Sequence, residues 1–367
     1  MGTGCERAAP RRLSIFAACV VALLLGAAAA LPGSAAARGA VGSVPAGFFG
    51  IVPQAPLSAG DFDRMQGVVG IVRVPIYWSE CEPEPGVYDF AAFDALVGAA
   101  AERGIRVLPF VYGTPPWLSP SLARPPLSKS ASTAWAAFLR VLVGRYGQRG
   151  SFWAARTGPR LPIRSWQIWN EPNFLLFWRP RPSPAGYARL LAVSSRAIHS
   201  RDRGARIVAA GLAPVGAGLT PWDFLYDLYK VPGAKRSFDV VAIHPYASTI
   251  RRMTAQVKVA RAVMRNAGDT AKPLLLSEVG VASGGDQPSS FVLGPTGQAS
   301  FLADAFSLLL KNRHRWHIAG VDWFTWQDAD SLDPYCSFCQ GAGLFDVEGR
   351  PKPSWTAYKR AVAAAVR

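Results

Sequence analysis

The sequence has few of the features that would mark a non-globular or a nucleic-acid-binding protein. Only 17% of its residues are charged and 50% are hydrophobic, which excludes a disordered chain and a coiled coil. The 35 glycines and 30 prolines are scattered, which excludes a collagen-like chain. Basic residues outnumber acidic ones by 40 to 24, a net charge of +16, but they never form a run of five or more. This spread is typical of a solvated basic surface and argues against nucleic acid as a partner.

Motifs for metals and cofactors are also missing. The sequence has no His-x-x-x-His pair and no carboxylate cluster of the kind that holds zinc or magnesium. Asp328, Asp330 and Asp333 are spaced like metal ligands but lack the Gly and the distal Glu of a calcium loop. The segment 50–54, where the first predicted strand ends, is not a Gly-rich phosphate loop. The sequence therefore predicts no metal and no cofactor.

The N-terminus has the pattern of an export signal. A positively charged stretch ending at Arg12 precedes an apolar stretch, Leu13–Leu31, and a small-residue cleavage pattern at 35–37. We expect residues 1–37 to be a signal peptide and the protein to be secreted or extracytoplasmic. The segment would contact a membrane only if it stayed uncleaved. Its removal leaves 37 basic and 23 acidic residues, a net charge of +14, which suggests an anionic glycan as a partner.

Three cysteines remain after the signal: Cys81, Cys336 and Cys339. Outside the cytoplasm we expect one disulfide and one free thiol. Cys336 and Cys339 are close in sequence, but Cys81 and Cys336 follow predicted strands and can share a face. The sequence therefore leaves all three pairings open.

Short apolar runs recur eight times along the chain. They are Gly47–Val52, Val68–Val74, Ile105–Val111, Ile163–Trp169, Arg206–Leu212, Phe238–Ile243, Pro273–Ser277 and Gly320–Trp326. Few of these runs alternate apolar with polar residues, which indicates strands buried on both faces of a parallel sheet.

Helical patterns lie between the runs. The clearest ones span Phe90–Arg103, Thr133–Tyr146, Pro184–Arg201 and Gln298–Asn312. Eightfold alternation of strand and helix predicts a (β/α)₈ TIM barrel. We assign it to residues 47–367 as a single domain, preceded by a short N-terminal tail at 38–46.

Acidic residues follow two of the predicted strands. The fourth strand leads into the segment 169–173, Trp-Asn-Glu-Pro-Asn, and the seventh ends at Ser277 and Glu278. A carboxylate after a buried strand is costly to desolvate unless it has a partner or a function. In this barrel both would point into the mouth where active sites lie. Glycoside hydrolysis needs two such carboxyl groups. The alternative interpretation is that both residues form structural salt bridges.

Aromatic residues crowd the same predicted face. Trp117, Trp178 and Trp326 lie in loops or at strand ends, where we expect them to stack on the apolar faces of sugars. Trp166 and Trp323 lie inside strands, where we expect core packing.

The segment 169–173 together with Glu278 resembles clan A of the retaining glycoside hydrolases, over about Phe48–Tyr358. The segment 112–117, Tyr-Gly-Thr-Pro-Pro-Trp, is most similar to family 39. The cellulase-like family 5 is a close rival. It commonly has a His at the end of strand 3, and this chain has none there.

The resemblance implies that Glu171 is the general acid/base and Glu278 the nucleophile. The other candidates for substrate binding are Arg73, Tyr112, Trp117, Asn170, Trp178, His244, Tyr246 and Trp326. By resemblance, Asn170 binds the sugar 2-hydroxyl and Trp326 forms the floor of its subsite. Arg73 would pair with Glu278 and lower its pKa, while burial would raise that of Glu171.

By the same resemblance, His244 and Tyr246 orient the carboxylates. A retaining mechanism predicts carboxyl groups about 5–5.5 Å apart. The expected function is that of an exported retaining glycosidase acting on the O-glycosidic bonds of an oligo- or polysaccharide. The alternative is a non-catalytic carbohydrate-binding relative of the same barrel at the cell surface.

Overall fold

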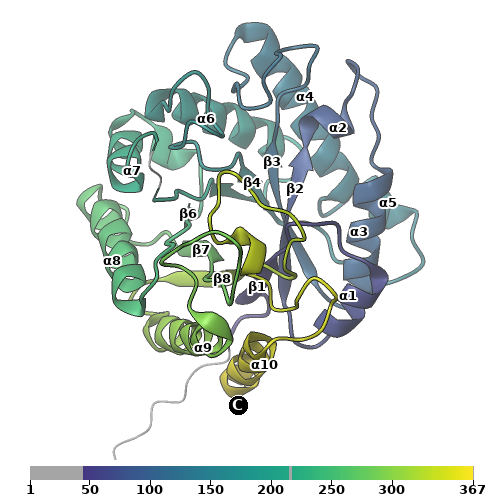
Figure 1. Cartoon of the computed structure of the whole chain (residues 1–367). Helices are drawn as coiled ribbons and strands as arrows, with labels where there is room; N and C mark the ends of the chain where they lie inside the picture. The colour runs from purple at the N-terminus through teal and green to yellow at the C-terminus, as the bar shows by residue number, and fades with distance from the viewer. Residues whose placement is uncertain (1–43, 215–216, 367) are drawn as a thin grey trace, which may run out of the picture. The chain divides into compact units, whose positions relative to one another are not determined.

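The computed structural model describes residues 44–214 and 217–366. Its strands are β1 (Phe49–Val52), β2 (Ile71–Tyr77), β3 (Arg106–Tyr112), β4 (Ser165–Ile168), β5 (Arg206–Ala209), β6 (Val241–Ile243), β7 (Leu274–Val279) and β8 (Ile318–Phe324). They pair in parallel in the order β5-β4-β3-β2-β1-β8-β7-β6 (Figure 1). Parallel bridges from Val208 to Val240 and from Leu212 to Ile243 connect β5 with β6. The predicted (β/α)₈ barrel is confirmed.

Helices surround the sheet (Figure 1). They are α1 (Ala59–Met65), α2 (Trp78–Cys81), α3 (Ala91–Glu102), α4 (Lys129–Tyr146), α5 (Ser151–Ala154), α6 (Pro184–His199), α7 (Pro221–Lys230), α8 (Ile250–Asn266), α9 (Gly294–Asn312) and α10 (Pro353–Val366), with 3₁₀ turns at Ala234–Arg236 and Cys339–Gly341. Ser128, Ser183, Thr220 and Thr249 cap the N-termini of α4, α6, α7 and α8 by accepting backbone N–H bonds. The four helices predicted most clearly are all present.

The inside of the barrel is filled by a small apolar cluster on the side away from the carboxyl ends of the strands. This cluster contains Leu108, Val208, Val240, Ala242 and Leu275, all buried. The opposite strand face packs against the helices in the main core. Because the interior is closed below, the chemistry is confined to the end where the strands finish.

The signal peptide predicted at residues 1–37 lies outside the described residues, as does most of the predicted tail at 38–46. Within the described part of the chain, none of the helices has both the length and the hydrophobicity to cross a bilayer.

Candidate active site

The structure brings the two predicted carboxylates together at the carboxyl end of the barrel. Glu171 comes from the segment after β4 and Glu278 from the end of β7. Each is only 8% exposed. One carboxyl oxygen of each lies within 4.8 Å of the other, and both lie within 4.8 Å of a ring nitrogen of His244.

Glu171 is held by a tight backbone turn after β4. Trp169 and Glu171 both have positive φ angles, 72° and 37°, which non-glycine residues rarely adopt. The Asn173 side chain holds this turn against the segment after β5, donating to Ala213 O at 2.8 Å and to Leu219 O at 3.0 Å. Backbone conformations of this kind cluster at functional sites, where surrounding contacts maintain them.

Glu278 receives two strong hydrogen bonds, one on each oxygen. Arg73 Nη1 donates to its Oε1 at 2.6 Å, and the Tyr246 hydroxyl donates to its Oε2 at 2.5 Å. Arg73 is fully buried and also donates to Asn170 Oδ1 at 2.8 Å and to Gln167 Oε1 at 2.9 Å. One guanidinium therefore fixes the nucleophile candidate and two amides at once, Gln167 in β4 and Asn170 just after it.

His244 lies between the carboxyl groups. Its Nδ1 is 2.7 Å from Glu171 Oε1 and 3.3 Å from Glu278 Oε2. Burial and the Arg73 charge lower the pKa of His244 well below its usual value, so the ring is neutral. A Cβ at Gly211 would lie 1.9 Å from His244 Nε2, so only glycine leaves room for the ring.

Burial raises the pKa of both carboxyl groups, but not equally. The pKa of Glu171 is raised well above its usual value by burial and then by the charge of Glu278. The pKa of Glu278 is also raised by burial, while Arg73 and the Tyr246 hydrogen bond oppose that rise. The expected lowering by Arg73 is present but is outweighed by desolvation, which corrects the sequence prediction. These opposing contacts act on Glu278 and make Glu171 the better proton donor of the two.

A third carboxyl group lies inside the barrel, and it was not identified from the sequence as part of the site. Asp322 in β8 is fully buried, and neither of its oxygens has a hydrogen-bond partner among the described residues. A Cβ at Gly50, its neighbour in β1, would lie 2.0 Å from Asp322 Oδ1. Burial raises the pKa of Asp322 to about 8. The single acidic residue inside the apolar run 320–326 was the available signal.

We predict that Asp322→Asn stabilises the protein, and more so as the pH rises. The folded-state pKa of Asp322 exceeds its unfolded value of 3.8, so the folded protein binds the extra proton between pH 4 and 8. Stability is therefore lost as the pH rises through that window, by about 4 kcal/mol at pH 7. Asn removes this loss. Urea unfolding at pH 5 and pH 7 measures the gain. An equal gain at both values would contradict the prediction.

Two of the predicted aromatic sugar contacts lie elsewhere. Trp326 is 2% exposed, donates to Asp61 at 2.9 Å and packs against Phe345 and Trp355. Trp178 is 1% exposed. Both rings are covered by core side chains and have no free face for a sugar, which corrects the sequence prediction.

Tyr112 and Trp117 pack on other aromatic rings, and the structure shows no hydrogen bond from either one to the carboxylates among the described residues. Tyr112 packs on Trp169 with ring centroids 4.8 Å apart, and the partly exposed Trp117 packs on Trp78. The aromatic side chain of β8 that packs on a residue of the site is Phe324, whose ring centroid lies 5.9 Å from that of Tyr246.

The cysteine pairing is resolved in favour of Cys336–Cys339, with Cys81 buried as a free thiol. The disulfide encloses a short loop that carries Phe338. This ring packs against Tyr246 with centroids 5.2 Å apart. The loop therefore supports the hydroxyl that binds Glu278.

Glu171, His244 and Glu278 are also spaced closely enough to hold a cation. Both oxygens of Glu278 already accept hydrogen bonds, one of them from the charged guanidinium of Arg73. A divalent ion would be repelled by that guanidinium, so the group suits proton transfer and nucleophilic attack better than metal binding.

The chain matches no protein-family model and no curated protein. Solved structures do resemble it. A family 39 glycoside hydrolase from Bacteroides cellulosilyticus WH2 is 21% identical with a TM-score of 0.64, over 87% of this chain and 64% of that enzyme. A family 39 enzyme from Xanthomonas axonopodis pv. citri is 20% identical with a TM-score of 0.65, over 88% and 67% of the two chains.

A family 5 enzyme of subfamily 18 from Streptomyces cattleya, in complex with Manβ1-4GlcNAc, is 20% identical with a TM-score of 0.64, over 86% and 80% of the chains. The chain shares the fold of these glycoside hydrolases. Both families belong to the clan named from the sequence motifs. The chain spans about two thirds of the length of the family 39 structures.

Proposed function

We propose that this protein is a retaining glycosidase that hydrolyses O-glycosidic bonds of an oligo- or polysaccharide. One observation carries the proposal: two buried carboxyl groups, with one oxygen of each within 4.8 Å of the other, have surroundings that separate their proton affinities. Retaining enzymes use carboxyl groups about 5–5.5 Å apart, whereas inverting enzymes need about 6.5–9.5 Å to admit a water. The observed spacing supports attack by Glu278 itself.

The reaction follows from the contacts. Protonated Glu171 gives its proton to the leaving glycosidic oxygen while Glu278 Oε2 or Oε1 attacks the anomeric carbon and forms a glycosyl ester. Glu171, now ionised, removes a proton from water, which attacks the same carbon and releases Glu278. Arg73 and Tyr246 hold Glu278 in place, and His244 positions Glu171. Asn170, fixed by Arg73, would bind the 2-hydroxyl of the sugar.

Export is part of the proposal. The pattern at residues 1–37 is that of a signal peptide, and a disulfide at Cys336–Cys339 suits an oxidising compartment.

The direct test is a panel of aryl β-glycosides, followed by proton NMR of the first product formed from each one that is cleaved. We expect the β-anomer to appear first and to mutarotate later, because two displacements retain configuration. Initial release of the α-anomer would contradict the retaining mechanism. Sugar binding without turnover on any substrate would favour the non-catalytic relative.

A further inference from the structure

The two ends of the barrel carry opposite charge. The segments that follow strands and contain charged residues are 78–90, 113–128, 169–183, 280–293 and 325–352. Apart from Glu171, they contain ten Asp or Glu residues against five Lys or Arg residues. The rim around the carboxylate pair is therefore acidic, although the chain as a whole is strongly basic.

The other end of the barrel holds the excess of positive charge. We call its helix-to-strand segments the basic face: 103–106, 147–164, 200–206, 231–240, 267–273 and 313–317. They contain fourteen Lys or Arg residues against three Asp residues. Since these segments all precede strands, they lie at the end opposite to the site. An anionic partner attracted by the net charge would meet this face and not the mouth.

Several arginines of the basic face are available to a partner. Arg149, Arg160, Arg203 and Arg206 are exposed, and the structure shows no ion pair or side-chain hydrogen bond for them with other described residues. Arg164 differs, since it pairs with Asp202 on the same face at 2.6 Å. Basic residues within a last helical turn can be explained by the helix dipole. These four lie beyond the helix ends, where that explanation weakens.

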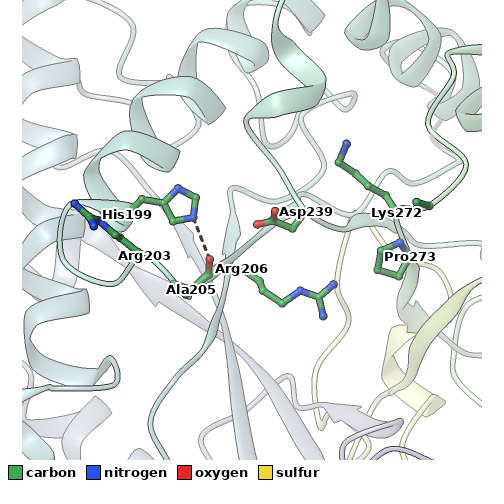
Figure 2. Close-up of a pocket in the computed structure, with 9 residues that line it drawn as sticks. His199, Arg203, Ala205, Arg206, Asp239, Lys272 and Pro273 are labelled. Atoms are coloured by element: carbon green, nitrogen blue, oxygen red, sulfur yellow. Dashed lines mark hydrogen bonds between the residues drawn. The ribbon is translucent and has the colours of Figure 1, made fainter.

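A hollow lies within the basic face, next to the starts of β5, β6 and β7. It has a volume of about 560 Å³ and is lined by Arg203, Arg206 and Lys272, among others (Figure 2). Asp239 lies between them in Figure 2 and already accepts a backbone hydrogen bond at 2.7 Å. A hollow of this size falls in the range of small-molecule sites, so it has room for a sugar unit bearing an acidic group.

The composition of the face selects among anionic partners. The exposed large hydrophobic side chains of the described residues all lie outside the basic face. Lipid surfaces are usually bound with inserted apolar side chains, and single-stranded nucleic acids with stacked aromatic rings. Twelve of the fourteen basic residues are arginines, whose planar guanidinium groups bind carboxylates and sulfates through paired hydrogen bonds.

We propose that the basic face binds an anionic polysaccharide and thereby presents the acidic, carboxylate-bearing end to a different saccharide. The acidic rim disfavours a polyanion in the mouth, so binding and hydrolysis take place at opposite ends. The binding site does not depend on turnover. A loss of polysaccharide binding at the basic face can therefore be distinguished from an absence of the proposed glycosidase activity.

The test measures the dissociation constant for polygalacturonate, with neutral dextran as the uncharged control. The variant Arg201→Gln/Arg203→Gln/Arg206→Gln removes three charges from the basic face. The matched control Arg189→Gln/Arg252→Gln/Lys258→Gln removes three exposed charges from the outer helices α6 and α8. We expect the face variant to bind about tenfold more weakly or worse and the control to change less than about twofold. Activity on a small aryl glycoside should stay unchanged in both.

Three results would overturn the proposal. Equal weakening in both triple variants would assign the effect to net charge rather than to this face. Absence of wild-type binding to polygalacturonate at low salt would exclude an anionic polysaccharide as the partner. Tighter binding to single-stranded DNA, or to vesicles of anionic lipid, than to polygalacturonate would assign the face to another class of macromolecule.

Discussion

Replacing Glu278 by Ala should abolish glycoside hydrolysis, with a loss in kcat of about 10⁴-fold or more, because no other group can form the glycosyl ester. The vacated space lies beside Arg73, which in the native protein donates to Glu278 Oε1 at 2.6 Å. A small anion such as azide can occupy it and attack the sugar from the same side. Activity should return with added azide, and the product should be a glycosyl azide of inverted configuration.

The matched control is Asp286→Ala, which removes an exposed carboxylate from the segment that follows β7. It should leave activity unchanged. Removing Glu278 also leaves the buried charge of Arg73 without its partner, which is destabilising. Urea unfolding should therefore accompany the kinetics, and Glu278→Gln provides a variant of nearly native volume. Full activity in either Glu278 variant would contradict the nucleophile assignment.

Replacing Glu171 by Gln should give a loss that depends on the leaving group. With a poor leaving group, proton donation is essential and kcat/KM should fall about 10³-fold. With a dinitrophenyl glycoside the first step needs no acid, so the loss should be much smaller and the glycosyl-enzyme should accumulate as a burst. The measurement is the ratio of the two losses.

The pH dependence of activity is a second test of the acid/base role of Glu171. Since burial and the charge of Glu278 raise the pKa of Glu171, wild-type activity should fall as the pH rises through that raised pKa. The variant has no proton to lose there and should show no such fall. Asp330→Asn, an exposed change on the same rim, should keep the wild-type profile. Equal losses on both substrates with an unchanged profile would contradict the acid/base role.

The barrel could be predicted because its strands are buried on both faces. Mostly apolar runs such as 105–111 and 273–277 are typical of such strands, and each run becomes a strand at or beside its expected place. The carboxylates could be predicted for a related reason. An acidic side chain that directly follows a buried strand, as Glu278 ends β7, must lie at the mouth of the barrel.

The aromatic contacts could not be predicted in the same way. Phe324 and Trp326 are two residues apart and would share a face in a continuing strand. β8 ends at Phe324, so alternation no longer governs Trp326, which turns to Asp61 instead. Packing beyond a strand end depends on tertiary partners that a local pattern does not contain.

The pKa of Glu278 and the distribution of charge over the surface also could not be predicted from the sequence. The pairing of Arg73 with Glu278 could be inferred from the motifs, but desolvation outweighs it, and burial is a property of the fold. Likewise, a net charge of +16 does not say where the charge lies. In the structure, acidic residues predominate at the rim around the carboxylates and basic residues on the opposite face.

The most direct test of the account is to trap the covalent intermediate. The protein would be incubated with activated 2-deoxy-2-fluoro glycosides of xylose, glucose, mannose and galactose in parallel, then digested and examined by mass spectrometry. We expect one glycosyl adduct, on the peptide that contains Glu278, formed by wild type and absent from Glu278→Ala. An adduct on a different residue in wild type, or the same adduct formed by Glu278→Ala, would contradict it.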